Sequence, residues 1–185
     1  MNSKNYIIKC NFLGDSGVGK TSLGKLFEQN KFINFINPTI GVEYFSKEYI
    51  VDKNKYKLQI WDLSGNRNFD NIINLYMKKV QIIFIIFDLS NKNTFNNIIK
   101  WIKKAKENTT NSKIILIGNK SDLNRQVSNN DINNITTQYN MNYNEISLKN
   151  NIGIEKLNND IKKIINTIIP KKIERKRDYC YCFQT

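Results

Sequence analysis

The segment Gly14–Thr21, GDSGVGKT, constrains the fold of this chain more than any other. It matches the pattern G-x-x-x-x-G-K-[ST], follows the apolar run Tyr6–Leu13 and opens the helix-period segment Lys20–Gln29. Glycines in such a loop let successive backbone N–H groups point at phosphate oxygens, and the helix directs its positive end at the same anion. A plain strand-to-helix turn with a capping residue would explain the glycines but not Gly-Lys-Thr at the helix start. The segment therefore predicts a phosphate-binding loop.

Two residues of this loop have individual chemical roles. We expect Lys20 to reach the outer phosphates of a nucleoside triphosphate, and the Thr21 hydroxyl to be a ligand of Mg²⁺. The residues expected to contact the nucleotide from this loop are Asp15, Ser16, Gly17, Val18, Gly19, Lys20, Thr21 and Ser22.

Apolar runs of strand length alternate with helix-period segments along the rest of the chain. The expected strands are Tyr6–Leu13, Tyr44–Val51, Tyr56–Trp61, Ile82–Phe87 and Lys113–Ile117, and the expected helices are Lys20–Gln29, Thr94–Lys106, Asp131–Tyr139 and Ile154–Ile169. The tetrapeptide DKNK separates the second and third strands and predicts a hairpin turn. This order indicates an α/β fold with a mostly parallel sheet and helices on both faces, which binds ligands beyond the carboxyl ends of its strands.

Bulk properties exclude several classes of protein. A chain of 185 residues fits one compact domain, and its longest apolar run, Ile82–Phe87, is too short to span a bilayer. The N-terminus lacks a secretory pattern and three cysteines are too few for a disulfide framework, so we expect a reducing cytosol. The formal net charge is +13, but the basic residues are spread along the chain and form no basic patch interleaved with aromatic residues, so we expect no nucleic-acid partner. The alternative, which rests on charge alone, is salt-dependent binding of nucleic acid.

A base-reading element follows the strand-like run KIILIG. Asn119–Asp122, NKSD, stands at the end of that strand, and the carboxylate of Asp122 can accept both N–H groups on the Watson–Crick edge of guanine. Adenine presents one amine and a bare acceptor nitrogen there, which the same carboxylate would repel. We therefore expect Asn119, Lys120 and Asp122 to bind guanine.

Two further segments complete the expected site. In Trp61–Gly65, WDLSG, Asp62 ends a strand and can hold Mg²⁺ through water, while Gly65 leaves its N–H free for the terminal phosphate. Thr39, in PTIGVEY, can give a second hydroxyl to Mg²⁺ from a loop between the first helix and the hairpin. The expected metal ligands are therefore Thr21, Thr39 and Asp62.

The motifs GDSGVGKTSL, PTIGVEY, WDLSG, FIIFDLSNKNTF, GNKSDL and EISLK, in this order, resemble those of the Ras-like small GTPases, and most of all the Rab branch. The resemblance implies a P-loop G domain over 1–169, with a six-stranded sheet that has one antiparallel strand. It also implies a monomeric switch of vesicle traffic that binds GTP or GDP with Mg²⁺ and hydrolyses GTP. Its implied partners are exchange factors, activating proteins, GDP-dissociation inhibitor or escort proteins, and effectors that bind both switch loops.

The same resemblance assigns further residues. Phe32 would pack against guanine, and Ser147, Leu148 and Lys149 would support the base from a last loop. Tyr44, Trp61 and Tyr76 fall where Rab proteins keep an aromatic triad that effectors read; ordinary core packing is the alternative for these rings.

The second switch departs from the family pattern WDTAGQERF, because this chain reads WDLSGNRNF. Asn66 stands where a glutamine usually orients the attacking water, and it is shorter by one methylene. Ser64 and Arg67 replace an alanine and a glutamate. With Lys20, Thr39, Gly65 and Asn66 as the catalytic residues, we expect tight nucleotide binding with slow hydrolysis. The alternatives are a pseudo-GTPase that sequesters effectors with little turnover, and Arg67 acting as an internal arginine finger.

The tail 170–185 carries five basic and two acidic residues and ends in Cys180-Tyr-Cys182-Phe-Gln-Thr185. Its cysteine pair resembles the terminal pair on which Rab proteins are commonly doubly geranylgeranylated, so we expect Cys180 and Cys182 to anchor the protein to the cytosolic face of intracellular membranes. Farnesylation of Cys182 alone fits less well, because Gln184 is polar, and an unmodified tail is the alternative. The composition leaves the source open between a protist and a large virus acting in a host cell.

Overall fold

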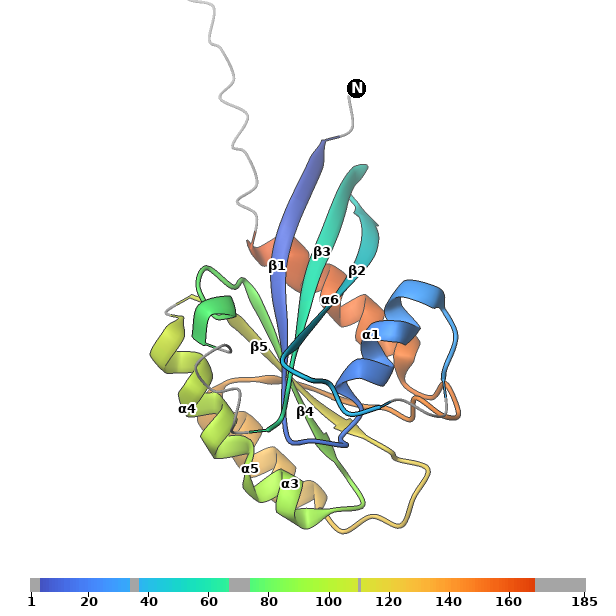
Figure 1. Ribbon diagram of the computed structural model, residues 1–185, viewed down its shortest axis with the longest axis vertical. Helices are drawn as coiled ribbons and strands as arrows, with labels where there is room; N and C mark the ends of the chain where they lie inside the picture. Colours follow the sequence, from blue (N-terminus) through green and yellow to red (C-terminus); the bar gives the residue numbers. More distant parts are fainter. Residues whose placement is uncertain (1–3, 34–36, 67–73, 110, 169–185) are drawn as a thin grey trace, which may run out of the picture.

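The structure is a computed structural model that describes residues 4–33, 37–66, 74–109 and 111–168 (Figure 1). Its strands are β1 (Asn5–Leu13), β2 (Val42–Val51), β3 (Asn54–Leu63), β4 (Ile82–Asp88), β5 (Lys113–Asn119) and β6 (Asn142–Glu145). Its helices are α1 (Lys20–Gln29), α3 (Lys92–Asn96), α4 (Ile98–Asn108), α5 (Asn129–Tyr139) and α6 (Ile154–Ile168).

The strands form one six-stranded sheet in the order β2-β3-β1-β4-β5-β6. Only β2 runs antiparallel to its neighbour, and the other four pairings are parallel. Because the parallel strands share one direction, the loops that follow β1, β3, β4, β5 and β6 meet at the same edge of the sheet. The predicted fold class is confirmed.

Helices cover the sheet on both faces, with α1 and α6 on one side and α3, α4 and α5 on the other (Figure 1). Each face has its own apolar core. The first packs residues of α1 and α6, such as Phe27 and Ile161, against Phe12 and Phe84. The second packs residues of α3, α4 and α5, such as Phe95 and Ile132, against Phe87. Strand β4 lies between these cores and is buried at every position, which explains its unbroken apolar sequence.

The β2–β3 hairpin lies at the sheet edge, and its two strands are joined by a two-residue turn between Val51 and Asn54. Its two loop residues, Asp52 and Lys53, have φ values of 47° and 65°, as a type I′ turn requires. The turn is thus shorter than the four-residue segment DKNK over which the sequence predicted it.

Two features of the fold were not predicted from local patterns in the sequence. The single helix expected over Thr94–Lys106 is two helices, which meet at Asn97 (φ −78°, ψ −7°), where the Asn97 amide also reaches out to Asp15. The sixth strand, β6, has the polar sequence NYNE and no apolar run that would predict it. The expected tail 170–185, Arg67 and Ile169 lie outside the described residues. Within the described ranges, no helix has the length and apolarity needed to cross a bilayer.

Candidate functional site

The loop between β1 and α1 wraps an anion-sized space at the carboxyl edge of the sheet. Gly19 precedes α1 with φ 103°, and no side chain of the described residues caps the helix start. A Cβ atom on Gly19 would lie 2.3 Å from the Asn119 amide nitrogen, so only glycine fits there. The first N–H groups of α1 therefore face the loop without a side-chain partner, as in helix termini that bind anions.

Lys20 is held inside this loop and is only 5% exposed. Its ammonium nitrogen donates to the carbonyl oxygens of Gly14 and Asp15, at 2.9 and 2.7 Å. Burial lowers the pKa of Lys20, and the negative charges of Asp62 and Asp15 partly offset this effect. The loop thus holds the Lys20 ammonium beside the N-terminus of α1.

Thr21, Thr39 and Asp62 come from three separate segments and converge on one point. The Thr21 hydroxyl lies 2.7 Å from that of Thr39 and donates to Asp62 Oδ2 at 2.5 Å, and Thr39 donates to the same oxygen at 3.2 Å. Asp62 is fully buried, and its second oxygen, Oδ1, has no hydrogen-bond partner among the described residues. Burial raises the pKa of Asp62, although hydrogen bonds from Thr21 and Thr39 and the charge of Lys20 oppose the shift.

These three residues fit Mg²⁺, which prefers oxygen ligands and keeps several waters or phosphate oxygens. Their hydroxyl and carboxylate oxygens lie within hydrogen-bond distance of one another, and the unpartnered Oδ1 of Asp62 provides a buried negative oxygen. The described part of the chain has no cluster of three His, Cys, Asp or Glu residues that could act as metal ligands.

Residues 37–41, which precede β2, and residues 64–66, which follow β3, meet over the phosphate-binding loop. The Ser64 N–H donates to the Gly41 carbonyl at 3.0 Å, and a Cβ atom on Gly65 would lie 2.4 Å from the Ser16 nitrogen. Together these segments enclose a hollow of about 210 Å³, lined by Ser16, Gly17, Gly19, Lys20, Thr21, Ser22, Asn37, Pro38, Thr39, Ser64 and Gly65.

Asn66 is exposed and does not line this hollow. Its backbone N–H donates to the Ser64 hydroxyl at 3.3 Å. Ser64 itself is only 4% exposed. The structure therefore brings Lys20, Thr39 and Gly65 of the expected catalytic residues together and leaves Asn66 at the rim. Arg67 lies outside the described residues.

A second hollow of about 350 Å³ adjoins the first and shares Gly17, Gly19 and Ser22 with it. It is further lined by Phe32, Asn119, Lys120, Asp122, Leu123, Leu148 and Lys149. Asp122 is held by the buried Ser147, whose hydroxyl donates to Asp122 Oδ1 at 2.5 Å. Every residue expected to bind the base therefore lines this hollow or, for Ser147, bonds to one that does.

Asn119 joins the loops around both hollows. Its side-chain amide donates to the Val18 carbonyl at 2.9 Å, and its Oδ1 accepts from the Leu148 N–H at 3.4 Å. The Val18 side chain packs in the core, so only its backbone faces the site. Asn119 is 3% exposed and thus links the phosphate-binding loop to the loop after β6.

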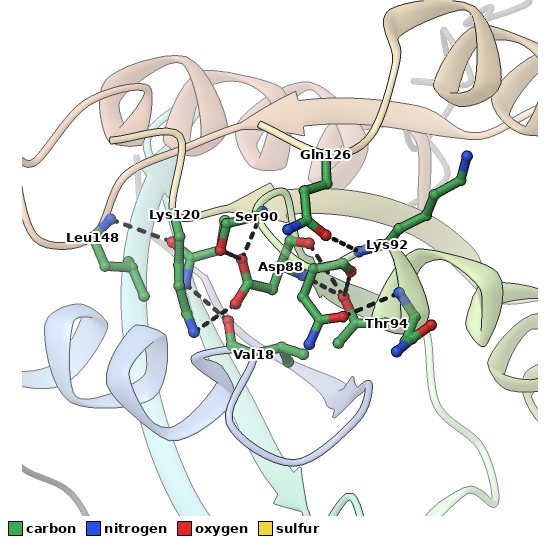
Figure 2. Close-up of polar contacts among 11 residues, drawn as sticks. Val18, Asp88, Ser90, Lys92, Thr94, Lys120, Gln126 and Leu148 are labelled. Atoms are coloured by element: carbon green, nitrogen blue, oxygen red, sulfur yellow. Dashed lines mark hydrogen bonds and ion pairs between the residues drawn. The ribbon is translucent and has the colours of Figure 1, made fainter. Parts of the chain in front are cut away.

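Three polar partners of the site, Asn97, Trp101 and Asp88, were not predicted from the sequence. The Asp15 carboxylate accepts from Trp101 Nε1 at 2.8 Å and from the Asn97 amide at 2.6 Å, which ties the phosphate-binding loop to α4. Asp88, at the end of β4, pairs with Lys120 at 2.6 Å (Figure 2). Each pairing joins residues far apart in the chain, so no local motif could reveal it.

The three expected aromatic residues form one contiguous group. The ring centroids of Tyr44 and Trp61 lie 5.1 Å apart, and those of Trp61 and Tyr76 lie 4.8 Å apart. Tyr44 is 41% exposed, and the neighbouring Ile40 and Leu75 are 85% and 66% exposed. Tyr44 is thus a surface residue, whereas Trp61 and Tyr76 are partly buried and pack against the second core, as the core-packing alternative expects.

Comparison with known proteins agrees with this architecture. Residues 9–167 match the Ras family. Ras-related protein Rab-8A of Bos taurus is 32% identical over 172 residues, which span 91% of this chain and 83% of that protein. Ras-related protein Rab-11B of Dictyostelium discoideum is 39% identical over 119 residues, covering 64% of this chain and 54% of that protein. With a phosphate-binding loop, an adjoining pocket and a six-stranded sheet that has one antiparallel strand, this chain belongs to the Ras family as a Rab-type small GTPase.

Proposed function

We propose that this protein is a guanine-nucleotide switch of membrane trafficking that binds GTP and GDP with Mg²⁺ and hydrolyses GTP slowly. One observation supports the proposal most. The two hollows share Gly17, Gly19 and Ser22, so the phosphate-binding loop leads directly into the pocket that holds the Asp122 carboxylate. A ligand that fills both must carry phosphates at one end and a ring at the other.

The base pocket favours guanine. The Ser147 hydroxyl donates to Oδ1 of Asp122, which leaves lone pairs on both carboxylate oxygens to accept the N1–H and exocyclic amine of guanine. Phe32 and the stem of Lys120 line the same pocket and can cover the faces of the ring. The backbone at Ser147–Lys149 would support the base from the far side.

The phosphate pocket supplies charge and metal ligands. Lys20 can exchange its two carbonyl partners for phosphate oxygens, and Thr21, Thr39 and Asp62 would hold Mg²⁺, which when bound neutralises charge on the phosphates. Because Thr39 and Gly65 belong to the two switch loops, contact with the terminal phosphate would order both loops, and its loss on hydrolysis would release them. The exposed side chains of Ile40, Tyr44 and Leu75 offer apolar surface that an effector would bind.

Slow turnover is supported by the second switch loop. Asn66 lies at the rim of the phosphate pocket, and its side chain is one methylene shorter than the usual glutamine. A misplacement near 1 Å can cost about 10²-fold in rate. A pseudo-GTPase that sequesters effectors is the second candidate, and the same observation favours it.

The remaining parts of the proposal concern partners and location. The G domain would span 1–169 and act as a monomer, with exchange factors, activating proteins and a GDP-dissociation inhibitor or escort protein as partners and no nucleic acid. The tail 170–185, with Cys180 and Cys182, would be prenylated and hold the protein at the cytosolic face of intracellular membranes. That tail lies outside the described residues, so its sequence alone supports this part.

The deciding experiment is to purify the full chain in Mg²⁺, identify the bound nucleotide by HPLC, and follow GTP turnover with and without a broad-range Rab activating protein. We expect bound GDP or GTP and slow hydrolysis. Asp122→Asn should abolish guanine selectivity, because its amide NH₂ opposes the guanine amine, whereas Asp52→Asn makes the same charge change at the hairpin turn and should have no effect. Retention of no guanine nucleotide, or equal binding of ADP, would refute the proposal.

A further inference from the structure

A buried carboxylate lies behind the base pocket and does not line it. Asp88 ends β4, and its side chain is 9% exposed. Figure 2 draws it with its partners Ser90 and Lys120. It is absent from the described residues that line either hollow of the site. A buried carboxylate costs folding free energy unless it has partners, so its contacts indicate what it does.

All partners of the Asp88 carboxylate hold it in one orientation. Oδ1 accepts from the Ser90 N–H at 2.8 Å and from the Ser90 hydroxyl at 2.6 Å, and Oδ2 pairs with the Lys120 ammonium at 2.6 Å. Burial acts to raise the pKa of Asp88, but the bonds from Lys120 and Ser90 outweigh it and lower the pKa overall. The carboxylate is therefore ionised at neutral pH.

The backbone around Asp88 is fixed to β5, the strand that ends immediately before Lys120. The Leu89 N–H donates to the Asn119 carbonyl at 2.9 Å, and the Asp88 N–H donates to the Thr94 hydroxyl at 3.0 Å. The distance between the two charged residues is thus set by the ends of β4 and β5, and not by a flexible loop.

Lys120 needs such a support. Its backbone has φ 61°, in the left-handed region that is unfavourable for a lysine, and its side chain is 34% exposed at the wall of the base pocket. A free lysine side chain loses rotamer freedom when a ligand orders it, and a side chain that is ordered beforehand avoids this loss.

We propose that Asp88 is a positioning residue, which fixes the Lys120 side chain at the wall of the base pocket before nucleotide binds. The inference rests on the proposed nucleotide site and adds to it a residue that touches no ligand. Because Asp122 reads the base edge, Asp88 contributes to how long a nucleotide stays bound and not to which base is chosen.

The test is a double-mutant cycle on GDP release from the full chain, followed with a fluorescent GDP analogue. Asp88→Asn keeps the size of the side chain and removes its charge, and we expect about tenfold faster release with unchanged preference for GDP over ADP. Lys120→Met should also speed release. In the Lys120→Met background, Asp88→Asn should add less than about twofold, because its effect runs through Lys120. Ser90→Ala is the matched control, since it removes one bond to Asp88 but keeps the ion pair.

Additive effects of the two substitutions, or unchanged release in Asp88→Asn, would overturn the inference. Failure of the wild-type chain to bind GDP would instead refute the proposed function. A measurement on the wild-type protein needs no folded variant: in nucleotide-free protein, mass spectrometry should show slower amine labelling of Lys120 than of the exposed Lys92. Equal labelling rates would show that Asp88 does not hold the Lys120 ammonium.

Discussion

The buried carboxylate of Asp62 lowers the stability of the fold, although we propose that it helps to bind Mg²⁺. It is fully buried, one of its oxygens has no partner among the described residues, and burial raises its pKa. An acid whose folded pKa lies above its unfolded value binds its proton more strongly when folded. Its ionisation therefore costs stability as the pH rises above about 4, the ordinary range of a carboxyl group.

We predict that Asp62→Asn stabilises the protein when nucleotide and metal are removed. In EDTA at pH 7.5 the melting temperature should rise by about 2–4 °C, and the difference should shrink as the pH falls and the wild-type carboxyl takes up its proton. Adding Mg²⁺ and GDP should stabilise the wild type more than the variant. A lower melting temperature for the variant at pH 7.5 in EDTA would contradict this prediction.

The predicted slow hydrolysis of GTP depends on the short side chain of Asn66. Asn66→Gln restores the missing methylene and should raise single-turnover GTP hydrolysis by about 10- to 100-fold, because the longer side chain can reach over the phosphate pocket. Asn130→Gln makes the same exchange at an exposed position of α5 and should leave the rate unchanged. The prediction fails if the wild type already hydrolyses GTP as fast as a Rab protein that carries the glutamine.

At the scale of elements, α4 braces the phosphate-binding loop. Trp101 is 2% exposed, and its indole N–H donates to Asp15, which lies 86 residues earlier in the chain. Trp101→Phe keeps an aromatic ring in the core and removes this bond, so we expect GDP release to become about 3- to 10-fold faster through a looser loop. Trp61→Phe makes the same exchange on β3, where the ring lies beside Tyr44 and Tyr76. Equal release from the two variants would show that the bond to Asp15 does not brace the loop.

The sequence predicted those elements and site residues whose signal is local. The phosphate-binding loop and NKSD are contiguous motifs at strand ends, and β4 is an unbroken apolar run between two cores. The polar edge strand β6 has no such signal, since it pairs along one side only and needs little apolar surface. Likewise, the ion pair of Asp88 with Lys120 exists only because β4 and β5 are adjacent in the sheet, which no spacing in the chain reveals.

At the scale of the whole molecule, we propose that the tail 170–185 attaches the protein to a membrane. No helix in the described ranges can span a bilayer, and the tail concentrates five basic residues ahead of its two cysteines. One lipid chain gives only marginal membrane binding, whereas two hold a protein stably. Basic residues beside the lipid add up to about 1 kcal/mol each at an anionic surface, which two acidic residues of the tail reduce.

We therefore predict stepwise loss of membrane attachment in a eukaryotic cell. Mass spectrometry of the full chain should show two prenyl groups, the single variants Cys180→Ser and Cys182→Ser should move partly to the soluble fraction, and the double variant should move almost wholly. Cys10→Ala is the matched control, because Cys10 is buried in β1 and burial raises the pKa of its thiol, which leaves it unreactive. An unmodified wild-type tail, or a double variant that stays on membranes, would show that attachment depends on some other part of the molecule.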